Sequence, residues 1–130
     1  MSNKTPQRPL SPHLQIYKPM LSMIMSIAHR ITGAGLYFGM AFLAWWLLAA
    51  ATSADYFNLV QAIYGSWLGR LILFGFTWAL LHHAIGGIRH FIWDTGRGFE
   101  LETVEIMAKI NLATSIVLTT LIWVIAYAVR

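Results

Sequence analysis

Residues 66–93 read SWLGRLILFGFTWALLHHAIGGIRHFIW, and this stretch decides the fold. It is longer than the roughly 20 residues that a helix needs to cross a bilayer, and its first half is almost entirely apolar. Its second half carries His82, His83, Arg89 and His90. An ionisable side chain inside the bilayer costs roughly 2.5–3.5 kcal/mol on insertion scales. The stretch therefore predicts a membrane helix whose polar residues hold a bound group.

The composition of the chain supports a membrane location. Of its 130 residues, 58% are hydrophobic and only 11% are charged, which is too apolar for a soluble domain with its own core. The chain contains no cysteine, which excludes disulfides and thiolate-bound iron–sulfur clusters within it. Any redox centre held here must use histidine. The net charge of +4 fits a membrane topology and requires no nucleic-acid partner.

Two further apolar runs flank this stretch. Together they predict an all-α integral membrane protein with a single three-helix membrane domain over residues 21–130, preceded by a polar tail of residues 1–20 that is not a secretory signal peptide. In residues 54–65, apolar side chains recur at helical spacing, which predicts a linker helix in the membrane interface. The predicted spans cover residues of about 21–51, 66–93 and 106–129.

The distribution of basic residues predicts the orientation. Lys4, Arg8 and Lys18 precede the first span, and Arg97 and Lys109 flank the loop between the second and third spans. The loop after the first span has no Lys or Arg. Because cytoplasmic loops are enriched in these residues, we expect a multi-pass protein of a bacterial cytoplasmic (inner) membrane, with a cytoplasmic N-terminus and a periplasmic C-terminus.

The histidine spacing in the second span suggests a haem. His83 and His90 are seven residues apart and share one helical face, with Gly87 between them. His83 would lie about 10 Å deeper than Arg89 and His90, which fall near the cytoplasmic boundary. An imidazole can ligate iron, a glycine leaves room for the macrocycle, and cations can pair with propionates. The ligand is His83 or, as second choice, His82; an interhelical hydrogen bond is the alternative for either.

Two longer motifs carry a resemblance to a known family. The motif H-x3-G-[IL]-R-H-x2-W-D-x-G runs from His83 to Gly96, and RPLSPHLQIYKP followed by SIAHRITG occupies the region from Arg8 to Gly33. Both resemble signatures of the cytochrome b subunits of succinate dehydrogenase, in the same order along the chain. The resemblance covers essentially the whole sequence.

This resemblance implies a membrane anchor of succinate:quinone oxidoreductase, respiratory complex II. In that family a flavoprotein subunit oxidises succinate, an iron–sulfur subunit carries the electrons, and two small anchors in the lipid bilayer bind one haem b and the substrate ubiquinone. The chain would thus belong to a hetero-oligomeric helix bundle and catalyse nothing alone. The resemblance also implies that His83 is the axial ligand and that the second anchor subunit supplies the opposite one.

Ser26 and Arg30 form a second candidate site. They are four residues apart and share one face of the first span near the cytoplasmic boundary. A hydroxyl and a guanidinium suit a quinone, which offers two carbonyl acceptors and develops negative charge on reduction. The resemblance implies the same role. The alternatives are a hydrogen bond from Ser26 to the Ser22 carbonyl and an Arg30 that reaches lipid phosphate.

Depth suggests three contacts to the haem propionates, His29, Arg89 and His90. Arg89 could instead pair with Asp94 or with lipid phosphate. Two rival functions stay open at this point: a cytochrome b anchor of another oxidoreductase, such as a hydrogenase, and a structural anchor without haem.

Overall fold

The computed structural model describes residues 16–129, and within this range all regular secondary structure is helical, without strands. Three of the helices, α1, α3 and α4, are long and apolar enough to cross a membrane. The predicted all-α fold with three membrane helices is therefore confirmed. The helices are α1 (Leu21–Thr52), α2 (Ala54–Gly65), α3 (Trp67–Asp94) and α4 (Leu101–Ala128).

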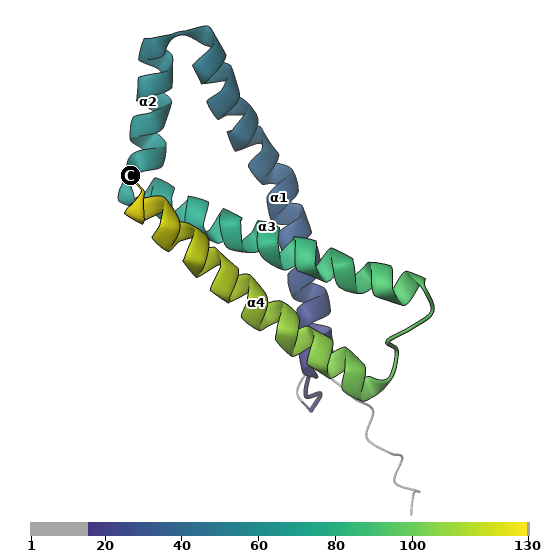
Figure 1. Ribbon diagram of the computed structural model, residues 1–130. Helices are drawn as coiled ribbons and strands as arrows, with labels where there is room; N and C mark the ends of the chain where they lie inside the picture. The colour runs from purple at the N-terminus through teal and green to yellow at the C-terminus, as the bar shows by residue number, and fades with distance from the viewer. Residues whose placement is uncertain (1–15, 130) are drawn as a thin grey trace, which may run out of the picture.

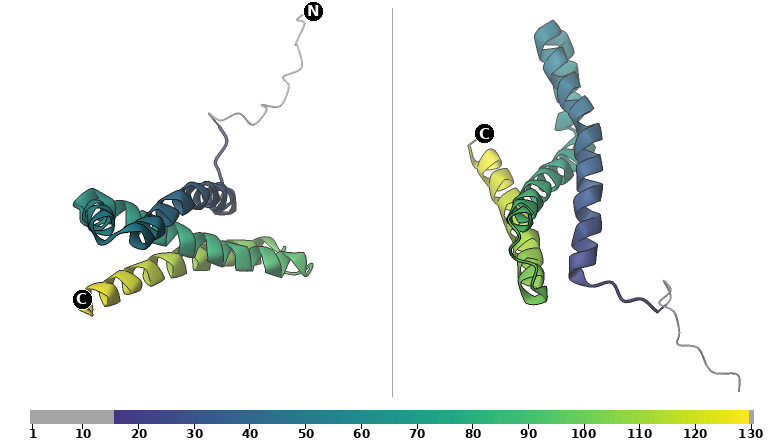
Figure 2. Two further views of the ribbon diagram at one scale, coloured as in Figure 1. Left: turned by 90° about the horizontal axis from the view of Figure 1, so that it is seen from above. Right: turned by 90° about the vertical axis from the view of Figure 1, so that its right-hand side faces the viewer.

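Helix α3 is the central element of the bundle. It packs against α4 along one side and is crossed by α1 on the other, so that α3 lies between them (Figures 1 and 2). Beyond the crossing, α1 and α3 diverge, and α2 bridges their separated ends to complete a triangle (Figure 1). The crossing is thus one corner of the triangle, and α2 forms the side opposite to it (Figure 1).

Two serines set the short connections on either side of α2. Ser53 separates α1 from α2, and its hydroxyl accepts a hydrogen bond of 3.2 Å from the Tyr56 backbone N–H. Ser66 separates α2 from α3 and caps Gly69 in the same way, at 3.1 Å. Such caps satisfy N–H groups that have no partner within the helix. The linker predicted to be helical is a helix, while its place in the membrane interface stays a prediction.

Helix α4 begins at Leu101, earlier than residue 106, where the third apolar run was expected to start. Its first turn is polar, with Glu102 at the end of the helix where the dipole favours an acid. Glu105 and Lys109 form an i,i+4 ion pair at 3.8 Å. The apolar run marks the part of α4 that can lie in the hydrocarbon of the membrane. The polar turns before it extend the same helix towards the membrane surface.

Polarity inside the bundle is the reverse of that in a soluble protein. Large apolar side chains such as Ile31, Phe38 and Leu71 are exposed, as expected for helices that face lipid. Without a strong hydrophobic drive between membrane helices, small and polar residues form the contacts instead. Six polar or charged residues are buried between the described helices: Thr32, His82, Arg89, Asn111, Ser115 and Thr119.

One stability prediction follows from the approach of α1 to α3. A Cβ built on Gly39 would overlap the ring of Phe76, whereas one built on Gly35, one turn earlier, would meet open space. We expect Gly39→Val to destabilise the protein by about 1–3 kcal/mol, because the Phe76 ring must turn away or the helices must separate. Gly35→Val is the matched control. The thermal midpoint of the purified assembly in detergent measures the difference, and equal midpoints would contradict the prediction.

Candidate functional site

Histidines of α1 and α3 meet where these helices cross. The rings of His29 and His83 stack with their centroids 4.0 Å apart and their planes 3° from parallel. His29 also stacks on His90, at 4.7 Å and 26°. The structure therefore brings together three of the predicted residues, with His29 of α1 between two histidines of α3.

The hydrogen bonds of His83 show which of its two ring nitrogens stays available for a ligand. Its Nδ1 lies 3.0 Å from the backbone carbonyl oxygen of His29 and 3.4 Å from the Thr32 hydroxyl oxygen. A carbonyl only accepts, so Nδ1 of His83 donates in this bond, and Nε2 is the ring nitrogen left to face a metal. No residue in the range 16–129 bonds to Nε2. The interhelical bond that was the alternative to ligation is thus formed, but through the other ring nitrogen.

Two glycines determine the space around His83. A Cβ on Gly33 would lie 2.8 Å from Cε1 of His83, so the imidazole occupies space that only a glycine leaves. A Cβ on Gly87 would meet open space, one turn along α3 from His83. His83 itself is half-buried. His29 covers the rings of His83 and His90 on this face, and the space next to Gly87 stays open for a flat group to approach.

His82 has a different environment. It is completely buried, with 0% of its surface exposed, and its ring centroid lies 5.0 Å from that of Trp78. Neither ring nitrogen has a hydrogen-bond partner within the described residues. Because its own chain encloses it, His82 cannot contact a group shared with another subunit unless the helices move.

Arg89 lies seven residues from His82 and so shares its face of α3, away from His83. It is only 4% exposed, and its guanidinium carbon lies 4.9 Å from the centroid of the Trp93 ring. Its Nε and Nη1 have no partner among residues 16–129. Within the same range the single ion pair joins Glu105 and Lys109, so the suggested Arg89–Asp94 pair is not formed.

Ser26 and Arg30 lie on the same stripe of α1 as His29 and Gly33, because their spacings of three, four and seven residues follow the helical repeat. Ser26 is half-buried and Arg30 is exposed. Within the described chain, Ser26 does not bond to the Ser22 carbonyl, although Thr32 makes the equivalent bond to Ala28 at 2.8 Å. The Ser26 hydroxyl and the Arg30 guanidinium therefore lie next to the histidine cluster, without hydrogen bonds to its histidines in the described chain.

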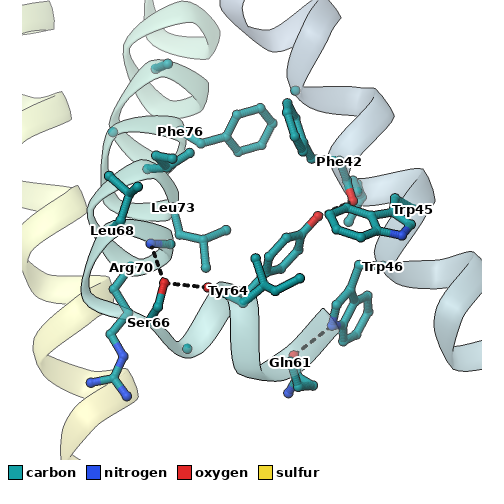
Figure 3. A pocket seen from close by; sticks show the side chains of 18 of the residues that line it. Phe42, Trp45, Trp46, Gln61, Tyr64, Ser66, Leu68, Arg70, Leu73 and Phe76 are labelled. Atoms are coloured by element: carbon teal, nitrogen blue, oxygen red, sulfur yellow. Dashed lines mark hydrogen bonds between the residues drawn. The ribbon is translucent and has the colours of Figure 1, made fainter. Parts of the chain in front are cut away.

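A cavity of about 950 Å³ lies elsewhere, inside the triangle of α1, α2 and α3, and the end of α4 also lines it (Figure 3). Its walls are mainly apolar and aromatic, and no histidine lines it. The Trp46 indole donates to Gln61 at 2.8 Å, and the Tyr64 hydroxyl donates to the Phe42 carbonyl at 2.7 Å. Burial raises the pKa of Tyr64, which keeps this donor protonated. These bonds fix α2 to α1 and hold the cavity open, but no candidate chemistry lies in it.

Fitness for a metal can be judged from the available ligands. Among residues 16–129 there is no group of three or more His, Asp or Glu side chains arranged to hold a bare metal ion. A haem iron needs only one or two protein ligands, since the porphyrin supplies four nitrogens. The half-buried imidazole of His83, whose Nε2 has no partner in the described chain, therefore fits a haem iron and not a bare metal ion.

Sequence reasoning missed Gly86 and Asn111. Asn111 is 1% exposed in the middle of α4, and a Cβ on Gly86 would contact both it and His29. The sequence does contain a sign of Asn111, because an amide within an apolar span needs a hydrogen-bond partner. Its partner could not be identified without knowing which helices meet.

Comparisons with known proteins give a consistent result. The family model described as the succinate dehydrogenase/fumarate reductase transmembrane subunit matches residues 4–122. The succinate dehydrogenase cytochrome b556 subunit of Paracoccus denitrificans is 42% identical over 120 residues, covering 92% of each chain. The b556 subunit of Rickettsia typhi is 40% identical over 118 residues, covering 91% of this chain and 92% of the relative. The cytochrome b560 subunit of Reclinomonas americana is 31% identical over 128 residues, covering 95% and 89%.

Proposed function

The chain belongs to the succinate dehydrogenase/fumarate reductase transmembrane subunit family, and from this membership we propose that it binds haem b and takes part in quinone reduction. It is a membrane subunit of a succinate dehydrogenase. In the proposed division of labour, a flavoprotein oxidises succinate, an iron–sulfur subunit delivers the electrons, and this chain with a second anchor passes them to ubiquinone. The chain itself does not dehydrogenate succinate.

The hydrogen bond from Nδ1 of His83 to the His29 carbonyl is the observation that supports the haem most strongly. A histidine that ligates a metal commonly donates its other ring N–H to a carbonyl, which fixes the tautomer and the ring plane. His83 makes this bond to the His29 carbonyl at 3.0 Å, on a face that Gly87 leaves open. His83, and not the enclosed His82, would hold the haem iron. When bound, haem b supplies a one-electron redox centre.

His29 and His90 are the proposed partners of the haem propionates. Both stack in the cluster with His83 and lie on the side of α3 that faces α1. Arg89 is the weaker candidate, because its guanidinium packs over Trp93 on another face. It would have to turn away from that ring to reach the same group.

Ser26 and Arg30 are the proposed donors to ubiquinone. Both can donate to a quinone carbonyl, and the fixed positive charge of Arg30 would stabilise negative charge that develops there on reduction. Their place on the α1 stripe that carries His29 supports a quinone next to the haem. The open side of this site implies further walls from a partner anchor, and the positions of Lys18, Arg97 and Lys109 support a cytoplasmic location.

A reduced-minus-oxidised absorption spectrum of the purified complex, together with its succinate-to-ubiquinone activity, tests this function. We expect a b-type band with about one haem per copy of the chain, and activity that requires all subunits. Absence of the band would favour the haem-free structural anchor. Several haems per copy without succinate-dependent quinone reduction would favour an anchor of another oxidoreductase.

A further inference from the structure

We propose that Asn111 of α4 positions the ring of His29 through the gap that Gly86 leaves in α3. The inference rests on the proposed function, because His29 packs against the proposed haem ligand. Asn111 lies outside both family motifs, and within residues 16–129 no hydrogen bond joins it to His83, Ser26 or Arg30. It would act through His29, as a positioning residue.

This inference rests on two buried polar groups that both lack a hydrogen-bond partner, the Asn111 amide and Nδ1 of His29. Asn111 is 1% exposed, and neither Oδ1 nor Nδ2 of its amide has a hydrogen-bond partner among residues 16–129. Nδ1 of His29 is also buried and lacks a partner in the same range. Buried polar atoms are rarely left unpaired, so each of these groups requires an explanation. One shared hydrogen bond, direct or through a water molecule, would explain both.

Gly86 brings the two groups to one place. A Cβ built on Gly86 would lie 2.5 Å from Nδ1 of His29 and 3.3 Å from Nδ2 of Asn111. Both nitrogens therefore flank one point on the surface of α3, and their separation cannot exceed the sum of these distances. One bridging water spans such a separation, and a direct bond would require the amide and the ring to move closer together. Since an amide both donates and accepts, it suits either tautomer of His29.

The position of His29 affects the whole cluster. Its ring stacks on His83 at 4.0 Å and on His90 at 4.7 Å, and its backbone carbonyl lies 3.0 Å from Nδ1 of His83. A hydrogen bond at Nδ1 fixes the plane of the ring and directs Nε2 away from α4. Asn111 thereby constrains the orientation of His83 from the far side of α3.

Arg89 offers the competing explanation. It lines, with Asn111, a small cavity of about 230 Å³ between α3 and α4, and its own Nε and Nη1 lack partners within the described chain. The Asn111 carbonyl could therefore accept from Arg89 instead. The stacking of His29 and its contact with the same glycine favour His29, and the experiment separates the two.

The test uses the assembled complex with two variants that remove the amide. Asn111→Leu keeps the branched shape of the side chain with a larger volume, and Asn111→Ala avoids overfilling the contact between α3 and α4. Ser115→Ala is the control, because Ser115 is equally buried one turn further along α4 and its hydroxyl bonds within its own helix to the Leu112 carbonyl at 2.9 Å. The readouts are the ¹⁵N resonances of the His29 ring, assigned with His29→Gln in histidine-labelled complex, and the haem midpoint potential.

We expect both Asn111 variants to move the His29 Nδ1 resonance towards that of a nitrogen without a hydrogen bond, and to shift the haem potential. Ser115→Ala should leave both at their wild-type values. An unchanged His29 resonance in both Asn111 variants would overturn the inference and leave Arg89 as the partner of the amide. A complex without any b-type band would refute the haem instead, and the ¹⁵N readout would still report on Asn111.

Discussion

His83→Ala is expected to remove the b-type absorption band from the purified complex, lowering its haem content at least about 10-fold. Even loss of a group that merely supports a metal ligand costs about 10–100-fold in metal affinity, and His83 is the proposed ligand itself. Its Nδ1 is committed to the His29 carbonyl at 3.0 Å, so Nε2 is the atom that the iron would lose. The measurement is the reduced-minus-oxidised spectrum, normalised to the amount of assembled protein.

His82→Ala provides the matched control on the neighbouring residue. It removes the same side chain from a site that is 0% exposed, so it should lower stability by leaving a cavity between α3 and α4. The haem band should nevertheless keep its position and most of its intensity. A lost band in His82→Ala together with a normal band in His83→Ala would reverse the assignment and require a different packing of α3.

The features of the fold that depend on sequence periodicity could be predicted. Apolar length locates the three membrane helices, since a helix that crosses hydrocarbon has no other way to satisfy its backbone. The seven-residue spacing places His83 and His90 on one face, and both do stack on His29. The start of α4 at Leu101 could not be read from apolarity, because the first turn of the helix is polar and carries Glu102.

Arg89 marks the limit of arguments from depth. Its position along α3 puts it at the level of His90, which is why both were expected at the propionates. The helical repeat turns it towards Asn111 of α4 instead, over Trp93. The position of a residue along a helix sets its depth in the membrane. The face of the helix on which the residue lies decides which neighbouring helix it contacts.

The crossing of α1 and α3 could not be predicted from the sequence, for a different reason. The stacking of His29 between His83 and His90 requires α1 to cross α3 at Gly33, where a Cβ would lie 2.8 Å from the imidazole of His83. The SIAHRITG motif contains Gly33 and His29, but nothing in its spacing states which helix it meets. Contacts between distant segments depend on tertiary packing, as the cavity framed by α2 also does.

Arg30→Ala is expected to lower kcat/KM for ubiquinone by about 100-fold while the haem band is retained. Removing one fixed donor from a site where negative charge develops typically costs about 10²–10³ in rate. The haem should remain, because His83 and its bond to the His29 carbonyl do not involve the Arg30 side chain. The measurement compares succinate-driven reduction of ubiquinone with reduction of a water-soluble dye that takes electrons from the soluble subunits.

Arg30→Lys and Arg97→Ala distinguish the proposed role from general electrostatics. Lysine keeps the charge of Arg30 but not the planar fork of donors, so Arg30→Lys should recover only part of the quinone activity. Arg97→Ala removes an equal charge from the exposed loop between α3 and α4 and should behave as wild type. If Arg30→Ala instead leaves quinone kinetics normal, its guanidinium serves only the membrane surface. The quinone would then need donors from the partner subunits, with Ser26 as the remaining donor of the pair on α1.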